Sequence, residues 1–239
     1  MADIAGDSET LLSSRESYSR ARLDQLVLGL NQLRSLQGVG NICIYATGSF
    51  GRLEASEHSD LDLFFVQTSD EAADPIGRID KTLVDADVIR LAREQGFPEF
   101  SRDGEFLEVH QLGAILAHLG GQEDDFRNYF TARLLLLLES RSVYADPVYG
   151  RALKRLVEAY YRDYQDHEMD FRPVFLANDI VRFWKTLCLN YEHRRNRPTD
   201  DQFTRAKSHL KNLQTEVQQN ADLLFRLGLG RCARDWTRP

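Results

Sequence analysis

The segment that most constrains the fold is Asp60–Gln67, which reads DLDLFFVQ. Its first half alternates acidic and apolar residues and its second half is almost wholly apolar, as in a strand that enters a core from the edge of a sheet. Side chains of a strand alternate between its two faces, so we expect Leu61 and Leu63 to be buried. Asp60 and Asp62 then share the opposite face, with roughly 7 Å between their Cα atoms. Two carboxylates this close repel each other, and a bound divalent cation removes the repulsion.

The surrounding sequence predicts the other elements of a small sheet. The segment Asn41–Thr47 is β-branched and aromatic and is bounded by glycines, so it predicts a strand, and Glu105–His110 predicts another. After Gln111 the sequence predicts helices and no further strand. We therefore expect an α/β (α+β) domain with a small mixed sheet over residues 1–120, followed by an all-α helical domain over residues 121–239.

Apolar residues at three- and four-residue steps predict the helices. The expected ranges are 20–36, 70–96, 126–141, 149–164, 174–193 and 201–226. In the first of them, the repeating apolar positions are Leu23, Leu26, Leu30 and Leu33. In the second, the side that we expect to be buried carries Ile79, Leu83, Val88 and Leu91.

Composition and charge exclude several classes of protein. The chain has 239 residues, of which 42% are hydrophobic and 28% charged, so it can form a globular core. Its net charge of −7 argues against a main role in binding nucleic acid, because that role needs a basic surface. Three well-separated cysteines are typical of free thiols in a reducing compartment. With no signal peptide and no apolar run longer than Leu134–Leu138, we expect a soluble cytoplasmic protein without a membrane partner.

A Gly-Ser pair stands between the first two predicted strands. Gly48 and Ser49 follow the first strand directly, and Asp60 and Asp62 open the second. Glycine permits a tight turn whose backbone N–H groups, together with the Ser49 hydroxyl, can approach a phosphate closely. Mg²⁺ is typically held by one or two carboxylates and by substrate phosphates, and Mn²⁺ could replace it. The four residues therefore predict a site for a metal-bound phosphate ligand.

The spacing of these four residues resembles that of the DNA polymerase beta-type nucleotidyltransferase superfamily. The signature of that superfamily is Gly-Gly or Gly-Ser at the start of a helix, with Asp-x-Asp about ten residues later. The run TGSFGRLEASEHSDLDLFFV is most similar to the protein-PII uridylyltransferase branch, in which Gly-Arg follows the pair, here Gly51-Arg52. A second run, ARLLLLLESRSVYADPVYGRAL, resembles the leucine-rich helix of that branch. The resemblance covers about residues 40–195.

The resemblance implies a third carboxylate from a later strand, and Glu108 fits that role. Alternation places Leu107 and Val109 in the core and Glu108 on the opposite face. The alternative is that Glu108 is an ordinary exposed strand residue.

Arg52 also has two interpretations. It could contact a triphosphate, or it could form an ion pair with Glu54 or Glu57.

The helix expected over 174–193 combines an apolar side with a cationic one. The apolar side carries Leu176, Ile180, Phe183, Trp184, Leu187 and Tyr191. Arg182 and Lys185 lie three residues apart on another side. In many nucleotidyltransferases a helical domain supplies cations to the triphosphate across a cleft, and the resemblance implies this role for both residues. The alternative is a solvated helix face.

The resemblance thus implies Mg²⁺-dependent transfer of a nucleoside monophosphate from an NTP such as ATP. The acceptor is a hydroxyl of a protein or small molecule, and pyrophosphate is released. Catalysis and metal binding are assigned to Asp60, Asp62 and Glu108. Nucleotide binding is assigned to Gly48, Ser49, Arg52, Arg182 and Lys185. The alternative function is a catalytically weak or inactive nucleotide-binding protein that acts in regulation or in a toxin–antitoxin interaction.

Overall fold

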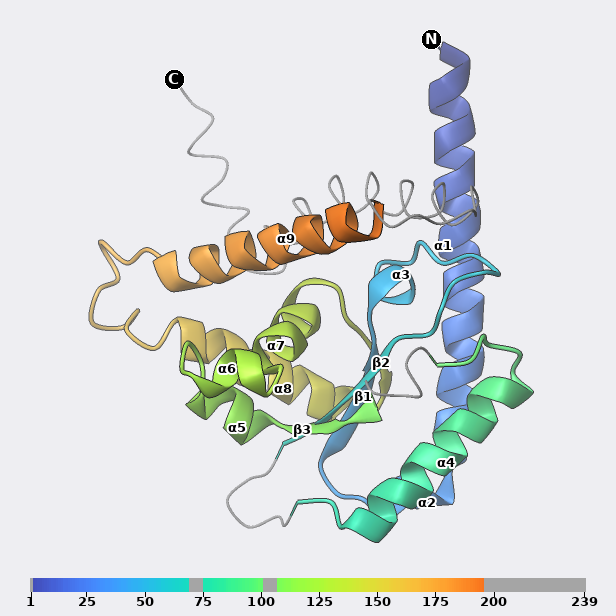
Figure 1. Cartoon of the computed structure of the whole chain (residues 1–239), viewed down its shortest axis with the longest axis horizontal. Coiled ribbons are helices and arrows are strands. Elements are labelled where there is room, and N and C mark those ends of the chain that lie inside the picture. Colours follow the sequence, from blue (N-terminus) through green and yellow to red (C-terminus); the bar gives the residue numbers. More distant parts are fainter. Residues whose placement is uncertain (1, 69–74, 101–106, 196–239) are drawn as a thin grey trace. The chain divides into compact units, whose positions relative to one another are not determined.

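The computed structural model describes residues 2–68, 75–100 and 107–195, and the statements below concern these residues (Figure 1). The chain divides into two compact units, Met1–Leu156 and Val157–Pro239. Among the described residues, the first unit holds the sheet and most of the helices. The second holds the end of helix α8 (Asp146–Tyr160) and the whole of helix α9 (Val174–Arg195). The division falls after Leu156 rather than at the expected residue 120, because a strand and several helices beyond residue 120 belong to the first unit.

The sheet is small and mixed, as the sequence predicts. Its strands are β1 (Ile42–Ala46), β2 (Leu63–Gln67), β3 (Val109–Gln111) and β4 (Arg141–Tyr144), in the spatial order β3-β2-β1-β4. Strand β1 is antiparallel to both β2 and β4, and β2 is parallel to β3. The expectation that no strand follows Gln111 is wrong, because β4 completes the sheet beside β1.

Helices flank the sheet and connect its strands. They are α1 (Ala2–Leu30), α2 (Arg34–Gln37), α3 (Gly48–Gly51), α4 (Arg78–Glu94), α5 (Leu112–Ala117), α6 (Glu123–Phe126), α7 (Tyr129–Leu138), α8 (Asp146–Tyr160) and α9 (Val174–Arg195). Helix α1 begins well before the predicted start at residue 20 and ends at Leu30, ahead of the short α2. The helix expected over 201–226 lies outside the described residues.

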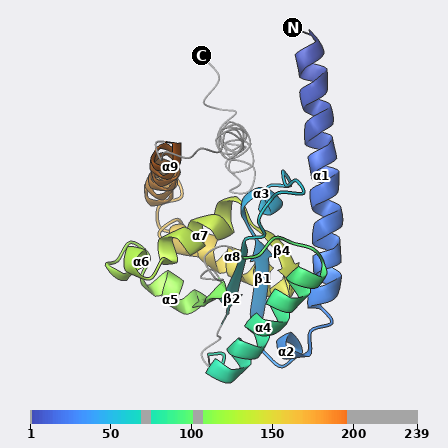
Figure 2. The ribbon, with the colours of Figure 1, turned by 45° about the vertical axis from the view of Figure 1, so that its right-hand side comes forward.

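One face of the sheet packs against α1 and α4 (Figure 2). Because side chains alternate along a strand, β1 and β2 each send every second residue to this face. The sheet contributes Ile42, Ile44, Ala46, Leu63 and Phe65 to this core. From α1, the buried residues Leu23, Leu26 and Leu30 confirm the predicted periodicity.

The buried side of α4 differs from the prediction. Val84, Val88 and Ala92 are buried, whereas Ile79 and Leu83 are 77% and 53% exposed. The buried residues follow one another at steps of four, which places them on one side of the helix. The predicted side was therefore wrong at Ile79 and Leu83 and correct at Val88.

The opposite face of the sheet carries aromatic residues, and α7 and α8 lie on this side (Figure 2). The ring of Tyr45 stacks on Phe64 with 5.7 Å between centroids, and Phe64 stacks in turn on His110. The hydroxyl of Tyr45 donates to the backbone oxygen of Ala132 in α7 over 3.3 Å. The sheet of the first unit is therefore covered on both faces.

In the second unit, α9 buries the side that the sequence predicts. Leu176 and Phe183 are buried, and Tyr160 donates a 2.6 Å hydrogen bond to Asp179. The predicted apolar positions Ile180, Trp184 and Leu187 are half-buried, and the side chain of Tyr191 lies outside the described residues.

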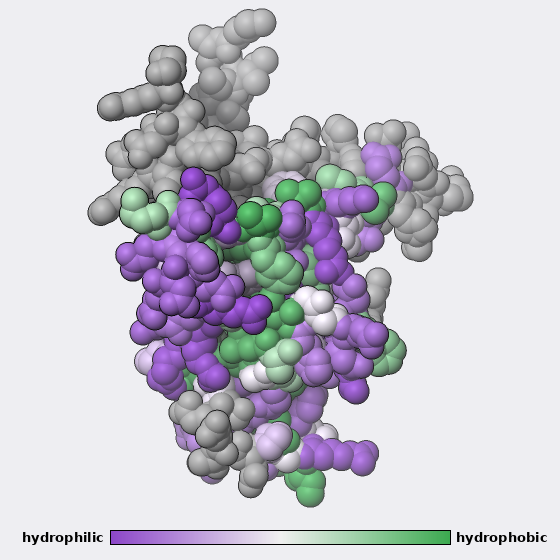
Figure 3. All heavy atoms as spheres, turned by 90° about the vertical axis from the view of Figure 1, so that its left-hand side faces the viewer, coloured by the Kyte–Doolittle hydropathy of each residue, from purple (hydrophilic) through white to green (hydrophobic). Residues whose placement is uncertain are grey.

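The surface combines hydrophilic regions with exposed apolar residues. On the face drawn in Figure 3, hydrophilic residues border a strip of apolar ones. Single exposed apolar side chains such as Phe126 and Met169 are ordinary in globular proteins. Within the described ranges, no helix is both long enough and apolar enough to cross a membrane.

Candidate active site

The two aspartates lie in the segment that leads into β2. The strand begins at Leu63, three residues later than predicted, but its ladder with β1 extends further, because the Thr47 N–H donates to the Asp62 carbonyl over 3.0 Å. Leu61 and Leu63 are buried, whereas Asp60 is exposed and Asp62 is half-buried. The predicted alternation between core leucines and accessible aspartates is therefore confirmed.

The carboxylate of the second aspartate occupies the space beside Gly48 that a side chain would need. Its φ of +61° lies in the left-handed region, which residues with a side chain rarely adopt. A Cβ atom at Gly48 would also lie 2.9 Å from Oδ2 of Asp62. Both the backbone conformation and the carboxylate therefore favour glycine here, and the turn after β1 meets the start of β2 at this point.

Ser49 lies in α3, the single helical turn that follows β1. The turn is closed by hydrogen bonds from the Gly51 and Arg52 N–H groups to the carbonyls of Thr47 and Gly48, at 3.1 and 3.0 Å. A further hydrogen bond of 2.8 Å runs from the Glu54 N–H to the Ser49 carbonyl. Ser49 is half-buried, and it lies with Gly48 at the end of β1 where the sequence predicts phosphate binding.

Arg52 forms two buried ion pairs. Its guanidinium contacts Glu54 at 3.0 Å and also contacts Glu139, and the three side chains are 7%, 7% and 5% exposed. Burial opposes the positive charge, but the two carboxylates outweigh burial and raise the pKa of Arg52 above its ordinary value. The structure thus has the ion-pair arrangement, with Glu139 in place of Glu57. The predicted contact of Arg52 with a triphosphate stays a prediction.

Glu139 also touches the turn through its backbone. A Cβ atom at Gly51 would lie only 1.9 Å from the Glu139 carbonyl oxygen, so this position has no room for a side chain. The two runs of sequence that carry the family resemblance therefore lie against each other. The sequence analysis quotes Glu139 within the second run but assigns it no role, because an ion pair between residues 87 positions apart leaves no local pattern.

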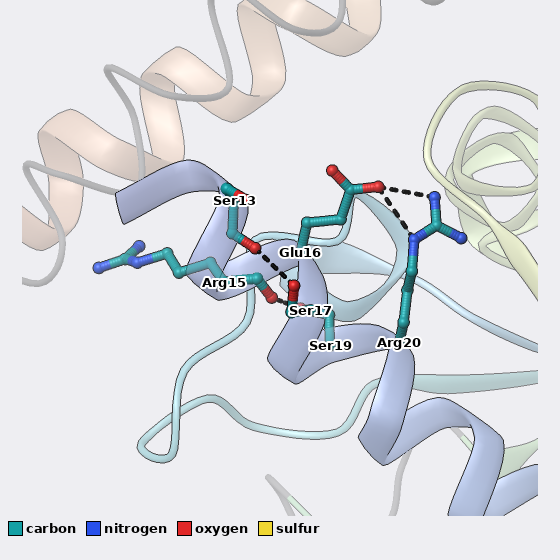
Figure 4. A network of polar contacts seen from close by, with 6 residues as sticks. All are labelled: Ser13, Arg15, Glu16, Ser17, Ser19 and Arg20. Carbon is teal, nitrogen blue, oxygen red and sulfur yellow. Dashed lines mark hydrogen bonds and ion pairs between the residues drawn. The ribbon is translucent and has the colours of Figure 1, made fainter. Parts of the chain in front are cut away.

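Helix α1 holds the chain just beyond Arg52. Ser19 is fully buried, donates to the Arg15 carbonyl over 2.7 Å and accepts a 2.9 Å hydrogen bond from the Ala55 N–H. Figure 4 shows this part of α1, in which Arg20 also pairs with Glu16. The segment between α3 and the aspartates is thus fixed to the first helix by a buried hydroxyl.

Glu108 lies one residue before β3 and is exposed. Leu107 and Val109 pack into the core shared with α1 and α4, whereas His110 stacks on Phe64 on the other face. Alternation therefore places Glu108 on the side of His110 and away from the core, as predicted. Burial lowers the pKa of His110 below its ordinary value, and the charge of Glu108 opposes that shift.

The donor set suits a magnesium ion that is shared with a phosphate ligand. Within the described part of the chain, no three His, Cys, Asp or Glu side chains gather closely enough to hold a metal ion on their own. Asp60 and Asp62 supply two accessible carboxylates, and the backbone of Gly48 lies against one of them. Two carboxylates completed by substrate phosphates are a usual environment for Mg²⁺, so the residues present fit this ion.

The two predicted cations of the helical part belong to the second unit. Arg182 and Lys185 lie in α9 and are exposed, on a different side from the buried Leu176 and Phe183. Their place on the polar side of the helix is confirmed. Their contact with a nucleotide stays a prediction.

Comparison with known proteins adds no relative to this picture. No protein-family model matches the chain, and no curated protein matches it either. The likeness to nucleotidyltransferases therefore stays a resemblance that the motifs carry.

Proposed function

We propose that this protein is a Mg²⁺-dependent nucleotidyltransferase. It would transfer a nucleoside monophosphate from an NTP to a hydroxyl of a protein or small-molecule acceptor and release pyrophosphate. The observation that carries the proposal is the proximity of Gly48 to the carboxylate of Asp62, whose Oδ2 would lie 2.9 Å from a Cβ atom at Gly48. This proximity joins the glycine of the first motif to the second aspartate, which is where a phosphate bound to the turn would meet a metal ligand.

The proposed roles follow from the chemistry of each residue. Asp60 and Asp62 would hold Mg²⁺, which neutralises phosphate charge and activates the attacking oxygen when bound. Gly48 and Ser49 would bind the triphosphate through backbone N–H groups and the Ser49 hydroxyl. As the acceptor oxygen bonds to the α-phosphorus and the bond to pyrophosphate breaks, a carboxylate oxygen of Glu108 would accept the hydroxyl proton.

The second candidate is a protein that binds nucleotide without turnover and acts through a partner. It uses the same proposed contacts of Gly48, Ser49, Asp60 and Asp62 with a Mg²⁺–NTP and needs no base at Glu108. Binding of a Mg²⁺–NTP without transfer to any acceptor would support this candidate over the enzyme.

The double substitution Asp60→Asn with Asp62→Asn tests the proposal. We expect it to abolish Mg²⁺-dependent transfer of label from α-³²P-labelled NTPs to cell-extract acceptors, while the protein stays folded. Asp60 is exposed and Asp62 is half-buried, so neither side chain belongs to the hydrophobic core. The matched control is Asp163→Asn with Asp166→Asn, which changes the net charge equally at two other exposed aspartates. Transfer that survives in the Asp60/Asp62 variant would refute the assignment of the active site.

Glu108→Gln tests the third carboxylate separately. We expect kcat to fall by about a hundredfold or more, in the range for loss of a general base, with a much smaller change in NTP affinity. The measurement is transfer under saturating NTP together with calorimetric titration of the same nucleotide. A normal kcat would show that Glu108 is an ordinary exposed residue.

A further inference from the structure

A buried cluster of three charges lies behind the Gly48–Ser49 turn. Arg52 contacts Glu54 and Glu139, and all three side chains are at least nine-tenths buried. Burying charged groups is costly unless they are paired, and removing one partner leaves an uncompensated charge. The cluster therefore holds Arg52 in one place.

Glu139 supports α3 in two ways. Its carboxylate pairs with Arg52, the residue that caps the C-terminus of α3, and its carbonyl oxygen lies where a Cβ atom of Gly51 would be. A helix of four residues has little stability of its own, because the free-energy cost of nucleating a helix is not offset by so few hydrogen bonds. The geometry of α3 thus depends on contacts from outside, and Glu139 supplies two of them.

The support extends to the candidate phosphate site through short contacts. The Arg52 N–H donates to the Gly48 carbonyl over 3.0 Å, and Gly48 lies against Oδ2 of Asp62. On the other side of Gly48, the Thr47 N–H is bonded to the Asp62 carbonyl. A shift of Arg52 would therefore move Gly48 relative to the carboxylate of Asp62.

We propose that Glu139, acting through Arg52, is a positioning residue that holds the Gly48–Ser49 turn in the geometry in which a triphosphate meets Asp62. The identity of the ligand in this inference rests on the proposed function. The effect of Glu139 on the order of the turn rests only on the contacts described above. Glu139 itself does not touch the ligand in this proposal.

A second buried ion pair, which lies outside the turn, provides a matched control for the loss of stability alone. Arg133 and Asp124 form a bidentate ion pair at 2.6 and 2.8 Å between α6 and α7, and their side chains are 0% and 2% exposed. Asp124→Asn therefore weakens an equally buried arginine–carboxylate pair outside the turn. Comparison with Glu139→Gln separates loss of positioning from loss of stability.

The experiment measures order in the turn and affinity for nucleotide independently. Wild type, Glu139→Gln, Arg52→Lys and Asp124→Asn are compared by amide hydrogen exchange of residues 47–52. Each is then titrated by calorimetry with the four Mg²⁺–NTPs and the corresponding monophosphates, well below its melting temperature. We expect exchange in the turn to accelerate about tenfold in Glu139→Gln and Arg52→Lys, because local opening becomes easier. NTP affinity should fall about tenfold in both, with little change for the monophosphate.

Asp124→Asn should lower the melting temperature and leave unchanged both the hydrogen exchange of residues 47–52 and the NTP affinity. If Glu139→Gln does not fold, Arg52→Lys decides, because it retains a positive charge inside the cluster. Unchanged exchange in the turn would overturn the inference even if the protein transfers nucleotides. Equal losses of NTP and monophosphate affinity would also overturn it, since they indicate general destabilisation. A wild type that binds none of the four NTPs would refute the proposed function, and the exchange data would still decide whether Glu139 orders the turn.

Discussion

Two glycines in the same turn are required for different reasons. At Gly51 a side chain would collide with the backbone of Glu139, at 1.9 Å, so the obstacle is the protein itself. At Gly48 the obstacles are a left-handed backbone, with φ of +61°, and the carboxylate of Asp62, a side chain that can move. Packing against backbone thus excludes a side chain at Gly51, whereas the geometry of the candidate site favours glycine at position 48.

Alanine substitutions should separate these two roles. We expect Gly51→Ala to lower the free energy of unfolding by about 3 kcal/mol, because the backbone must shift to admit a methyl group. Gly48→Ala should cost about 1–2 kcal/mol for the left-handed conformation, and should reduce transfer more than its stability loss explains. Urea unfolding and labelled transfer measure the two effects.

Gly150→Ala in α8 is the control, since a Cβ atom there meets nothing within 4 Å. It should leave activity unchanged and raise stability by up to about 1 kcal/mol. If Gly51→Ala lowered the free energy of unfolding no more than this control does, the close contact between Gly51 and the Glu139 carbonyl would be refuted.

At the level of elements, the sequence predicted the strands that carry strong local signals. Strand β1 is rich in apolar and β-branched residues and β2 in leucine and phenylalanine, and both were found within a few residues of the predicted bounds. Strand β4 was missed because its four residues, RSVY, begin only three residues after the end of a leucine-rich helix, with no glycine or proline to mark the change. Its pairing with β1 is a long-range contact that periodicity does not detect.

The side of α4 that faces the core was misjudged for a related reason. Leu83 and Val84 are neighbours and both apolar, so the local pattern fits two helix orientations about 100° apart. Packing against α1 and the sheet selects the orientation that buries Val84. In the candidate site, likewise, the motifs identified Gly48 and Asp62, whereas the ion pair between Arg52 and Glu139 needed the fold.

Helix α9 carries the prediction that concerns nucleotide binding by the second unit. Lys185 is exposed, and a charge-assisted hydrogen bond to phosphate contributes roughly 1.5–3 kcal/mol. Lys185→Ala should therefore weaken NTP binding about tenfold to a hundredfold and monophosphate binding far less. Lys185→Arg, which keeps the charge, should retain most of the affinity. Equal NTP affinities for wild type and Lys185→Ala, in the same titrations, would show that Lys185 is a solvated surface residue with no role in nucleotide binding.

At the scale of the whole molecule, a buried cysteine reports on the integrity of the first unit, and an exposed one in the second unit serves as its reference. Cys43 in β1 is completely buried, and burial raises the pKa of its thiol from 9.0 to about 12. Because the thiolate is the reactive form, this shift alone lowers its population about a thousandfold below pH 9. Cys188 in α9 is exposed, and Cys232 lies outside the described residues.

We expect iodoacetamide at pH 8 to label Cys188 within minutes and Cys43 only after unfolding. Peptide mass spectrometry over a time course, with and without denaturant, measures both rates in one sample. Applied to each variant above, labelling of Cys43 distinguishes a disrupted first unit from a local change at the site. Labelling of native Cys43 as fast as that of Cys188 would contradict the burial of β1.

The two strands that pair with β1 are synthesised at different times. Strand β2 is the next strand along the chain, whereas β4 and the adjoining Glu139 follow only after α7. During synthesis a nascent chain can therefore pair β1 with β2 long before Glu139 has left the ribosome, since contacts between distant residues form late. Until then the Gly48–Gly51 turn lacks the charge partner and the carbonyl that it packs against in the finished protein. The order of translation thus delays the final geometry of the Gly48–Gly51 turn until α7 and Glu139 have been made.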